Sequence, residues 1–252
     1  MDIRGQVALV TGAGSGLGAA TARGFAARGA RVIVMDRDGD AAKTVASDVG
    51  VAAACDVSDG DAVAEALAAA IEEVGTPRIV VNCAGIAPAA RVVSRDGTLS
   101  IDTFEAVLRV NLLGSYTVMS HAARAMGSLA PLETGERGVI INTASVAYQD
   151  GQVGQTAYSA SKGAIAALTL PAAREMARQG IRVMAIAPGL FRTPMMESLP
   201  EDVTDKITAN IPFPARLGMA EEYALLAAQI VENPYLNGEV IRLDGAVRLP
   251  QK

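Results

Sequence analysis

Short runs of β-branched residues alternate with longer alanine-rich segments along almost the whole chain, and this alternation restricts the possible folds more than any other feature. Strands are expected at residues 7–10, 31–35, 51–54, 78–82, 138–143, 181–187 and 239–243. Helices are expected at residues 16–28, 39–48, 59–73, 102–126, 157–178 and 220–231. Strands that alternate with helices build parallel sheets with helices on both faces. The sequence predicts an α/β fold, a doubly wound parallel sheet of about seven strands.

No linker, internal repeat or low-complexity tract divides the chain, and we predict one domain over residues 1–252. Two segments interrupt the alternation, a polar loop at 86–101 and a proline-rich stretch at 188–219. Loops this long inside a compact domain are usually functional, so residues 188–219 are predicted to form a substrate loop; a surface flap with its own small core is the alternative. Pro171 lies inside the expected helix 157–178 and is expected to kink or split it.

Composition excludes several classes of function. The net charge is −5 and no run of five basic residues occurs, which argues against nucleic acid as a partner. Cys55 and Cys83 are too few for a disulfide or metal framework and are expected to be buried thiols. His121 is expected in the core or an interface, and we predict no metal site. The chain shows no signal segment or membrane span, so we predict a cytoplasmic protein without a membrane partner.

A glycine-rich turn lies between the first expected strand and the first expected helix, in the sequence "TGAGSGLG". Its glycines are Gly12, Gly14, Gly16 and Gly18. Glycine at this place permits a tight turn and lets a pyrophosphate approach the backbone at a helix N-terminus. A plain tight turn gives the same pattern, but the strand before it and the helix after it favour a dinucleotide site.

Asp36 ends the second expected strand, and its position bears on which dinucleotide binds. An acid there accepts hydrogen bonds from the adenosine ribose and repels a 2′-phosphate, which favours NAD over NADP. Arg37 is the opposing indication, because an arginine beside this site can hold the phosphate. Asp36 could also be a simple turn acid in "MDRDGD", but we predict NAD as the cofactor.

At this point the chain resembles the short-chain dehydrogenase/reductase family along nearly its whole length. The matching segments occur in order and are "TGAGSGLG", Asp36, "DV" at 56–57, "NCAG" at 82–85, Asn111, Ser145, "YSASK" at 158–162 and "PG" at 188–189 with Thr193. The likeness is greatest to members that act on 3-hydroxyacyl-CoA and hydroxysteroids, and it includes the 86–101 insertion. It implies a Rossmann fold and NAD-dependent interconversion of a secondary alcohol and a ketone. It also implies a homotetramer.

The resemblance also assigns roles to individual residues. It implies catalytic roles for Asn111, Ser145, Tyr158 and Lys162. It implies cofactor contacts for Gly12, Ser15, Gly16, Leu17, Gly18, Asp36, Asp56, Val57, Asn82, Cys83, Ala84, Gly85, Tyr158, Lys162, Pro188, Gly189, Phe191 and Thr193. It implies substrate contacts for Ser145, Gln155 and Tyr158. Arg192 departs from the pattern, since a small residue is expected there.

The chemistry of this set begins with Tyr158 and Lys162, which lie four positions apart on one expected helix face. A phenol with a pKa of about 10 is a poor base at neutral pH. A nearby ammonium stabilises the phenolate, by about three pKa units at about 4 Å. The phenol can then take the proton of an alcohol while hydride leaves for NAD. Ser145 is expected to hold the substrate oxygen, and the family resemblance implies that Asn111 holds a water that links Lys162 to solvent.

Two other functions remain open from the sequence. An NADPH-dependent 3-oxoacyl carrier-protein reductase shares the same residues, although Asp36 opposes NADPH. A dinucleotide-binding scaffold without turnover needs the glycine turn but not Asn111, Ser145, Tyr158 and Lys162 together. The preferred interpretation is an NAD-dependent enzyme that acts on an acyl-CoA or steroid-like alcohol.

Overall fold

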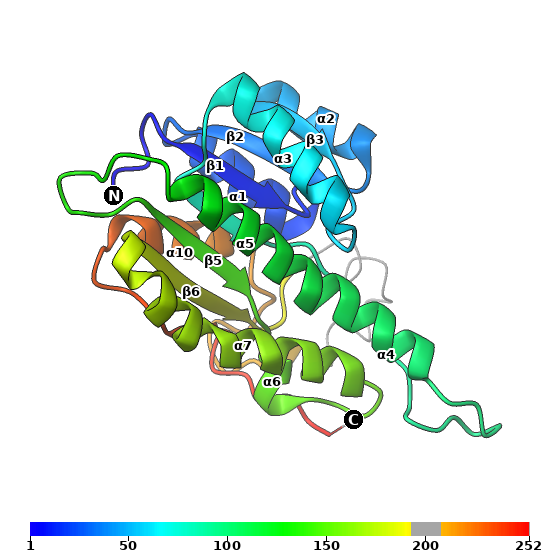
Figure 1. Cartoon of the computed structure of the whole chain (residues 1–252). Coiled ribbons are helices and arrows are strands. Elements are labelled where there is room, and N and C mark those ends of the chain that lie inside the picture. Colours follow the sequence, from blue (N-terminus) through cyan, green and yellow to red (C-terminus); the bar gives the residue numbers. More distant parts are fainter. Residues whose placement is uncertain (193–207, 252) are drawn as a thin grey trace.

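The computed structural model describes residues 1–192 and 208–251. Within these residues, seven parallel strands form one sheet in the order β3-β2-β1-β4-β5-β6-β7 (Figure 1). The strands are β1 (Val7–Thr11), β2 (Arg31–Asp36), β3 (Gly50–Ala54), β4 (Ile79–Asn82), β5 (Gly138–Thr143), β6 (Ile181–Pro188) and β7 (Val240–Leu243). The predicted doubly wound parallel sheet is confirmed, and each strand lies within a few residues of its expected range.

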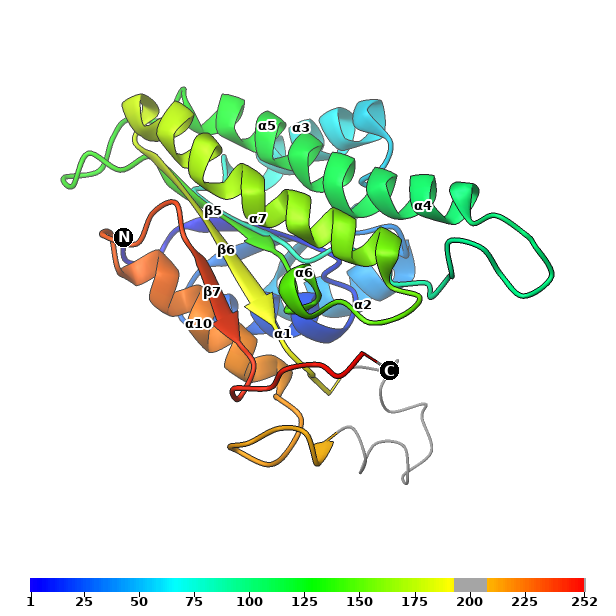
Figure 2. The same ribbon diagram turned by 90° about the horizontal axis from the view of Figure 1, so that it is seen from below.

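Helices cover both faces of the sheet, as Figures 1 and 2 show. The helical elements are α1 (Gly16–Ala26), α2 (Gly39–Val49), α3 (Gly60–Val74), α4 (Ile101–Leu108), the π-helix η1 (Arg109–Gly114), α5 (Ser115–Met126), α6 (Ala147–Asp150), α7 (Thr156–Met176), the 3-10 helix η2 (Ala177–Gln179) and α10 (Ala220–Glu232). One buried cluster joins the sheet to α1, α2 and α10, and another joins the opposite face to α3, α5 and α7.

The local sequence explains where several helices begin. The Asp38 carboxylate accepts hydrogen bonds from two backbone N–H groups of the first turn of α2, and Asp59 does the same for α3. Such caps satisfy amides that have no partner inside the helix. Ser15 occupies the same position before α1, but its side chain makes no cap hydrogen bond. The first turn of α1 therefore keeps amide groups that an anion can use.

The expected helix 102–126 is one continuous rod of α4, η1 and α5, with a π-helical turn at its centre (Figure 1). The expectation that Pro171 splits the following helix is wrong, because α7 continues through it from Thr156 to Met176. Pro171 is exposed, and Ala172 and Ala173 beyond it are packed into the core beneath the helix. Tertiary burial on that side outweighs the loss of one backbone hydrogen bond.

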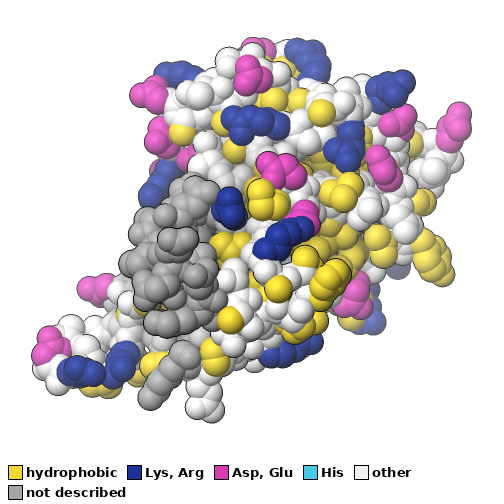
Figure 3. Space-filling model, turned by 180° about the vertical axis from the view of Figure 1, so that it is seen from behind, with side chains coloured by type: hydrophobic (Ala, Val, Ile, Leu, Met, Phe, Trp, Pro, Cys, Tyr) yellow, Lys and Arg dark blue, Asp and Glu magenta, His cyan; other side chains and the backbone are white. Residues whose placement is uncertain are grey.

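The 86–101 segment is a loop up to Ile101, where α4 begins, and it extends away from the body of the molecule (Figure 1). On the face shown in Figure 3, basic and acidic side chains are interspersed. His121 is half-buried on α5 rather than in the core, and its Nδ1 lies 3.1 Å from Nη2 of Arg124. None of the helices described is both long and apolar enough to cross a membrane.

Candidate active site

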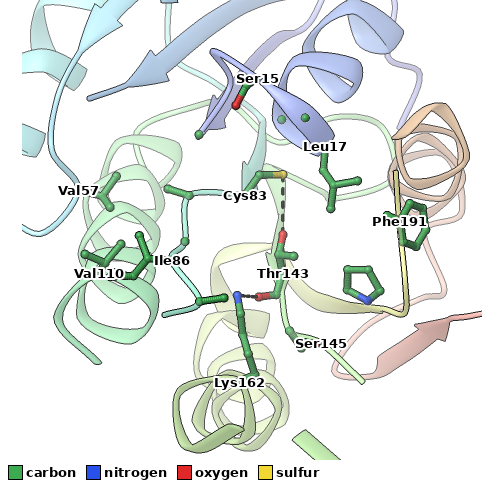
Figure 4. Close-up of a pocket in the computed structure, with 18 of the residues that line it drawn as sticks. Ser15, Leu17, Val57, Cys83, Ile86, Val110, Thr143, Ser145, Lys162 and Phe191 are labelled. Atoms are coloured by element: carbon green, nitrogen blue, oxygen red, sulfur yellow. Dashed lines mark hydrogen bonds between the residues drawn. The ribbon is translucent and has the colours of Figure 1, made fainter. Parts of the chain in front are cut away.

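A cleft of about 550 Å³ opens at the carboxyl ends of the strands, near the switch point between β1 and β4, from which the chain adds strands in opposite directions. Ligands of doubly wound sheets bind at this point, because the loops on either side diverge there. Most of the residues assigned to the site from the sequence line this cleft (Figure 4). They are Gly12, Ser15, Gly16, Leu17, Gly18, Asp36, Asp56, Val57, Cys83, Ala84, Gly85, Ser145, Tyr158, Lys162, Pro188, Gly189 and Phe191.

The glycine turn forms one wall of the cleft and needs glycine at specific places. Gly12 has φ of +61°, and a Cβ there would lie 2.8 Å from Cα of Ala84 in the loop after β4. Gly18 passes so close to Gly12 that a Cβ would overlap the carbonyl oxygen of Gly12. The turn therefore presents bare backbone to the cleft, which is the surface that a pyrophosphate requires.

Asp36 stands beside this turn at the end of β2. Its carboxylate accepts a hydrogen bond of 2.9 Å from N–H of Gly14 and one of 3.0 Å from N–H of Asp38. Arg37 lines the cleft next to it, so both residues that bear on the choice of dinucleotide are present. Asp56, beyond β3, receives a backbone hydrogen bond from Ser58, and this bond holds the pKa of its carboxyl below the usual value.

Ser145, Tyr158 and Lys162 come together at the other end of the cleft. Ser145 follows β5, is buried, and its Oγ accepts a 3.2 Å hydrogen bond from N–H of Ala147. Tyr158 and Lys162 project from the first turns of α7, and Nζ of Lys162 lies 5.7 Å from the centre of the Tyr158 ring. Lys162 is 4% exposed, and its Nζ donates a 2.7 Å hydrogen bond to the carbonyl oxygen of Thr143 (Figure 4).

The acidities of these groups differ from the expectation that Lys162 lowers the pKa of Tyr158. Burial raises the pKa of the Tyr158 hydroxyl, and a hydrogen bond with Ser145 opposes the rise only in part. Burial also lowers the pKa of Lys162 to about 8, with the nearby Cys83 acting in the opposite direction. Both shifts have one physical origin, since burial disfavours the charged form of either group. In the free protein, burial is therefore the largest influence on the pKa of each group.

Asn111 lies in η1 and is buried, close to the cleft but not in its lining. Its amide accepts from N–H of Ile86 at 2.8 Å and donates to the carbonyl oxygen of Ile86 at 2.9 Å. A further bond of 3.1 Å reaches Oγ of Ser161 on α7. Asn111 thus fixes the loop after β4 against the helix that carries Tyr158 and Lys162. The water-holding role expected of it stays a prediction.

Three other assigned residues lie away from the lining or outside the described residues. Asn82 is buried in β4, and its Nδ2 donates to Oδ1 of Asn142 at 2.8 Å, which ties β4 to β5. Gln155 precedes α7, and its Oε1 accepts a 3.1 Å hydrogen bond from N–H of Gln152. Thr193 falls outside the described residues, as does much of the 188–219 loop. Arg192 is exposed, away from the cleft lining.

Sequence reasoning missed several residues that line the cleft. They are Cys55, Ile86, Ala87, Val110, Thr143, Ala144 and Leu190, and Arg37 was weighed only as a counter-indication. Their closeness to assigned positions could have indicated them, since each lies within two residues of one. Groups of three or more His, Cys, Asp or Glu that could hold a metal ion do not occur among the described residues.

Comparisons with known proteins agree with this geometry. The profile of the short chain dehydrogenase family matches residues 6–204. The chain is 49% identical to human 3-hydroxyacyl-CoA dehydrogenase type-2, over 98% of this chain and 97% of that protein. It is 37% identical to mouse (3R)-3-hydroxyacyl-CoA dehydrogenase, over 98% of each.

A solved structure gives the same result. The crystal structure of 3-hydroxyacyl-CoA dehydrogenase type-2 from Mycobacterium avium superposes with a TM-score of 0.93 at 41% identity. The match covers 98% of this chain and 97% of that one. Fold, cleft and relatives over nearly the full length lead to one conclusion, that the chain is an oxidoreductase of the short-chain dehydrogenase family.

Proposed function

We propose that the chain is an NAD-dependent dehydrogenase that interconverts 3-hydroxyacyl-CoA and 3-oxoacyl-CoA. The observation that carries this proposal is the meeting of Ser145, Tyr158 and Lys162 at one end of a cleft whose other end is the glycine turn. The names of the relatives supply the substrate class. A scaffold that only bound a dinucleotide would not need a buried ammonium beside a phenol and a serine.

The residues present fit a nicotinamide dinucleotide. The bare backbone at Gly12 and Gly18 and the uncapped first turn of α1 suit its pyrophosphate. Asp36 suits the adenosine ribose, with Asp56 and Val57 beside the adenine. Further contacts are proposed for the residues near the nicotinamide half, namely Asn82, Cys83, Ala84, Gly85, Tyr158, Lys162, Pro188, Gly189, Phe191 and Thr193. When bound, the nicotinamide accepts or gives the hydride.

NAD is proposed rather than NADP because of the carboxylate of Asp36. Both of its oxygens already accept backbone hydrogen bonds, so the charge is held in place at the end of β2. A 2′-phosphate on the ribose would meet this charge and lose binding energy. Arg37 could compensate in part, and a rate assay with both cofactors decides between the two effects.

The acid–base chemistry follows from the two buried groups. Because burial raises the pKa of Tyr158, its hydroxyl is protonated at neutral pH and can donate its proton to a ketone oxygen that is being reduced. In the opposite direction, the phenolate takes the proton of the alcohol. Ser145 holds the same oxygen by a hydrogen bond. Lys162, still mostly charged below pH 8, would stabilise the phenolate and bind the ribose hydroxyls.

The cleft wall near these groups suits a lipid-like substrate. Ile86, Val110, Leu190 and Phe191 present apolar side chains to it. An acyl chain or a steroid-like alcohol can bury against such a surface. The relatives include proteins named for the (3R) hydroxyl, so each enantiomer of 3-hydroxybutyryl-CoA is a necessary substrate in the assay.

We also propose that the protein is a homotetramer. Large apolar side chains are exposed on η1, α5 and α7, where Leu113, Tyr116 and Leu170 are 50%, 54% and 44% exposed. Apolar surface of this kind on neighbouring helices is typical of subunit interfaces. Light scattering is expected to give about four times the chain mass of 25.8 kDa, and a mass of one chain would contradict the proposal.

The test of the proposed reaction follows reduced-cofactor absorbance with acetoacetyl-CoA, comparing NADH with NADPH. We expect rapid oxidation of NADH and slow oxidation of NADPH. Tyr158→Phe should lose turnover but keep NADH binding, measured by fluorescence. Tyr235→Phe is the matched control, because Tyr235 is 97% exposed and loses the same hydroxyl.

A fully active Tyr158→Phe variant would refute the mechanism. A clear preference for NADPH would favour a 3-oxoacyl carrier-protein reductase instead. Cofactor binding without turnover, on acyl-CoA, steroid and other secondary alcohols alike, would favour a scaffold. Each result separates one of the alternatives from the proposal.

A further inference from the structure

Three polar side chains from three separate segments meet at the wall of the cleft. They are Cys83 after β4, Thr143 at the end of β5 and Tyr223 on α10. The oxygens of Thr143 and Tyr223 lie 2.7 Å apart, and Sγ of Cys83 lies 3.8 Å from each of them (Figure 4 shows the Cys83–Thr143 contact). The three contacts close into a ring.

The hydrogen bonds of this ring have one consistent direction. The thiol of Cys83 donates to the Tyr223 oxygen, and the hydroxyl of Thr143 donates to the sulfur of Cys83. The Tyr223 hydroxyl is then left to donate to Oγ1 of Thr143. Each member donates one hydrogen bond and accepts one, so no group in the ring is left unsatisfied. Buried polar groups are tolerated on this condition, because an unpaired one is costly.

Tyr223 itself does not reach the cleft. Its side chain is 0% exposed and lies in the core between α10 and the sheet, whereas Cys83 and Thr143 both line the cleft. Phenylalanine would fill the same space without a polar group to satisfy. The hydroxyl of Tyr223 therefore needs an explanation other than packing.

Thr143 supplies the link from this ring to the proposed chemistry. Its side chain belongs to the ring, and its backbone carbonyl accepts the 2.7 Å hydrogen bond from Nζ of Lys162. Thr143 is the last residue of β5, and β6 pairs with it at Ile186, whereas the pairing with β4 ends one residue earlier, at Asn142. The hydrogen bond to Tyr223 therefore holds the side chain of the same residue whose backbone carbonyl binds Lys162.

We propose that Tyr223 is a positioning residue for Lys162, which it holds in place through Thr143 without touching substrate or cofactor. This inference rests on the proposed function, in which Lys162 serves the reaction. It adds that α10, an element outside the cleft lining, takes part in setting the position of the ammonium.

Removal of the hydroxyl should leave the helix in place. The guanidinium of Arg182 donates to the carbonyl oxygens of Ile230 and Val231 at 2.9 Å each, which anchors the end of α10 independently. The ring of Tyr223 would remain as phenylalanine in the same apolar cluster. Tyr223→Phe is therefore a test of the hydroxyl rather than of the fold.

The experiment compares Tyr223→Phe, Thr143→Val and Thr143→Ser with the unaltered protein. We expect the first two to lower kcat about tenfold with little change in KM. A displaced Lys162 supports Tyr158 less well in the reaction but does not weaken substrate binding. Thr143→Ser keeps the hydroxyl and should therefore have the kcat of the unaltered protein. Thr169→Val is the matched control, since Thr169 is a fully buried residue of α7 whose hydroxyl donates to the backbone carbonyl of Ile165.

A second readout needs no turnover. Lys162 lines the cleft, so its amine can be labelled with acetic anhydride over a range of pH and quantified by mass spectrometry. The midpoint reports the pKa of Lys162, which is about 8 in the unaltered protein. Tyr223→Phe should lower this midpoint, because a displaced Thr143 carbonyl stabilises the ammonium less. Thr169→Val should leave it unchanged.

The outcomes separate this inference from the proposed function. An unchanged kcat and labelling midpoint in Tyr223→Phe, even with lower thermal stability, would overturn the positioning role. If Lys162→Met also retained full turnover, the proposed function itself would be wrong. A lowered labelling midpoint in Tyr223→Phe, together with an inactive Lys162→Met, supports both the positioning role and the proposed function. An unchanged kcat in Thr143→Ser assigns the effect to the hydroxyl.

Discussion

Replacement of Lys162 by methionine should change how stability depends on pH. The ammonium is 4% exposed, and burial lowers its pKa from 10.5 to about 8 in the folded chain. Below pH 8, folded and unfolded chains both carry the proton, and the folded chain bears the full cost of the buried charge. Between pH 8 and 10.5, the unfolded chain binds more protons, so the free energy of unfolding rises with pH.

The size of the effect follows from the same shift. A fall from 10.5 to about 8 corresponds to about 3 kcal/mol. The unaltered protein should therefore gain about 3 kcal/mol relative to Lys162→Met when pH rises from 7 to 10.5. Methionine has a similar length and no charge, so the difference between the two proteins isolates the ammonium.

The assay is urea unfolding, followed by circular dichroism, at several pH values between 7 and 10.5. Tyr158, Cys83 and the other ionisable groups are present in both proteins, so their contributions to the pH dependence largely cancel. Lys43→Met provides a control, because the Lys43 side chain is 73% exposed and should give no such difference. If the free energy of unfolding changed with pH in the same way in the unaltered protein and in Lys162→Met, burial of the Lys162 ammonium would not destabilise the folded chain, and the reasoning would be wrong.

Three further results are expected. Because Lys162 must be charged to act, kcat should fall as pH rises above about 8, and a flat profile to pH 9.5 would contradict this role. Asp36→Ala should raise the NADPH to NADH ratio of kcat/KM about tenfold by removing one repulsive charge; an unchanged ratio would remove Asp36 from the choice of cofactor. Gly18→Ala should abolish NADH binding, measured by fluorescence, because its Cβ overlaps Gly12, whereas Gly163→Ala, in open space on α7, should keep binding and raise stability by up to about 1 kcal/mol.

Much of the fold could be predicted because its signals are local. The strands of this sheet are apolar runs, and the turn before α1 is marked by glycines, of which Gly12 and Gly18 leave no room for a Cβ. Asp36 follows from its place at the end of a strand. The assigned residues Tyr158 and Lys162 share a helix face because their spacing fixes it. Parallel strands then bring these separate segments to one edge.

The contacts inside the site could not be predicted in this way, because each joins residues far apart in the chain. Asn111 forms hydrogen bonds with the backbone of Ile86 from a π-helical turn, which the sequence pattern did not predict. Asn82 bonds within the sheet instead of lining the cleft. The continuity of α7 through Pro171 depends on the core beneath it.

The sequence by itself determined the order of strands and helices, the glycine turn and the chemical identity of the assigned groups. Only the tertiary structure decided their electrostatic state. Burial raises the pKa of Tyr158 and lowers the pKa of Lys162, because removal from water disfavours the charged form of each group. It also decided that Thr143 receives the ammonium and that Tyr223, from the far end of the chain, supports Thr143. Such effects depend on which surfaces meet in three dimensions, and neither composition nor spacing contains that information.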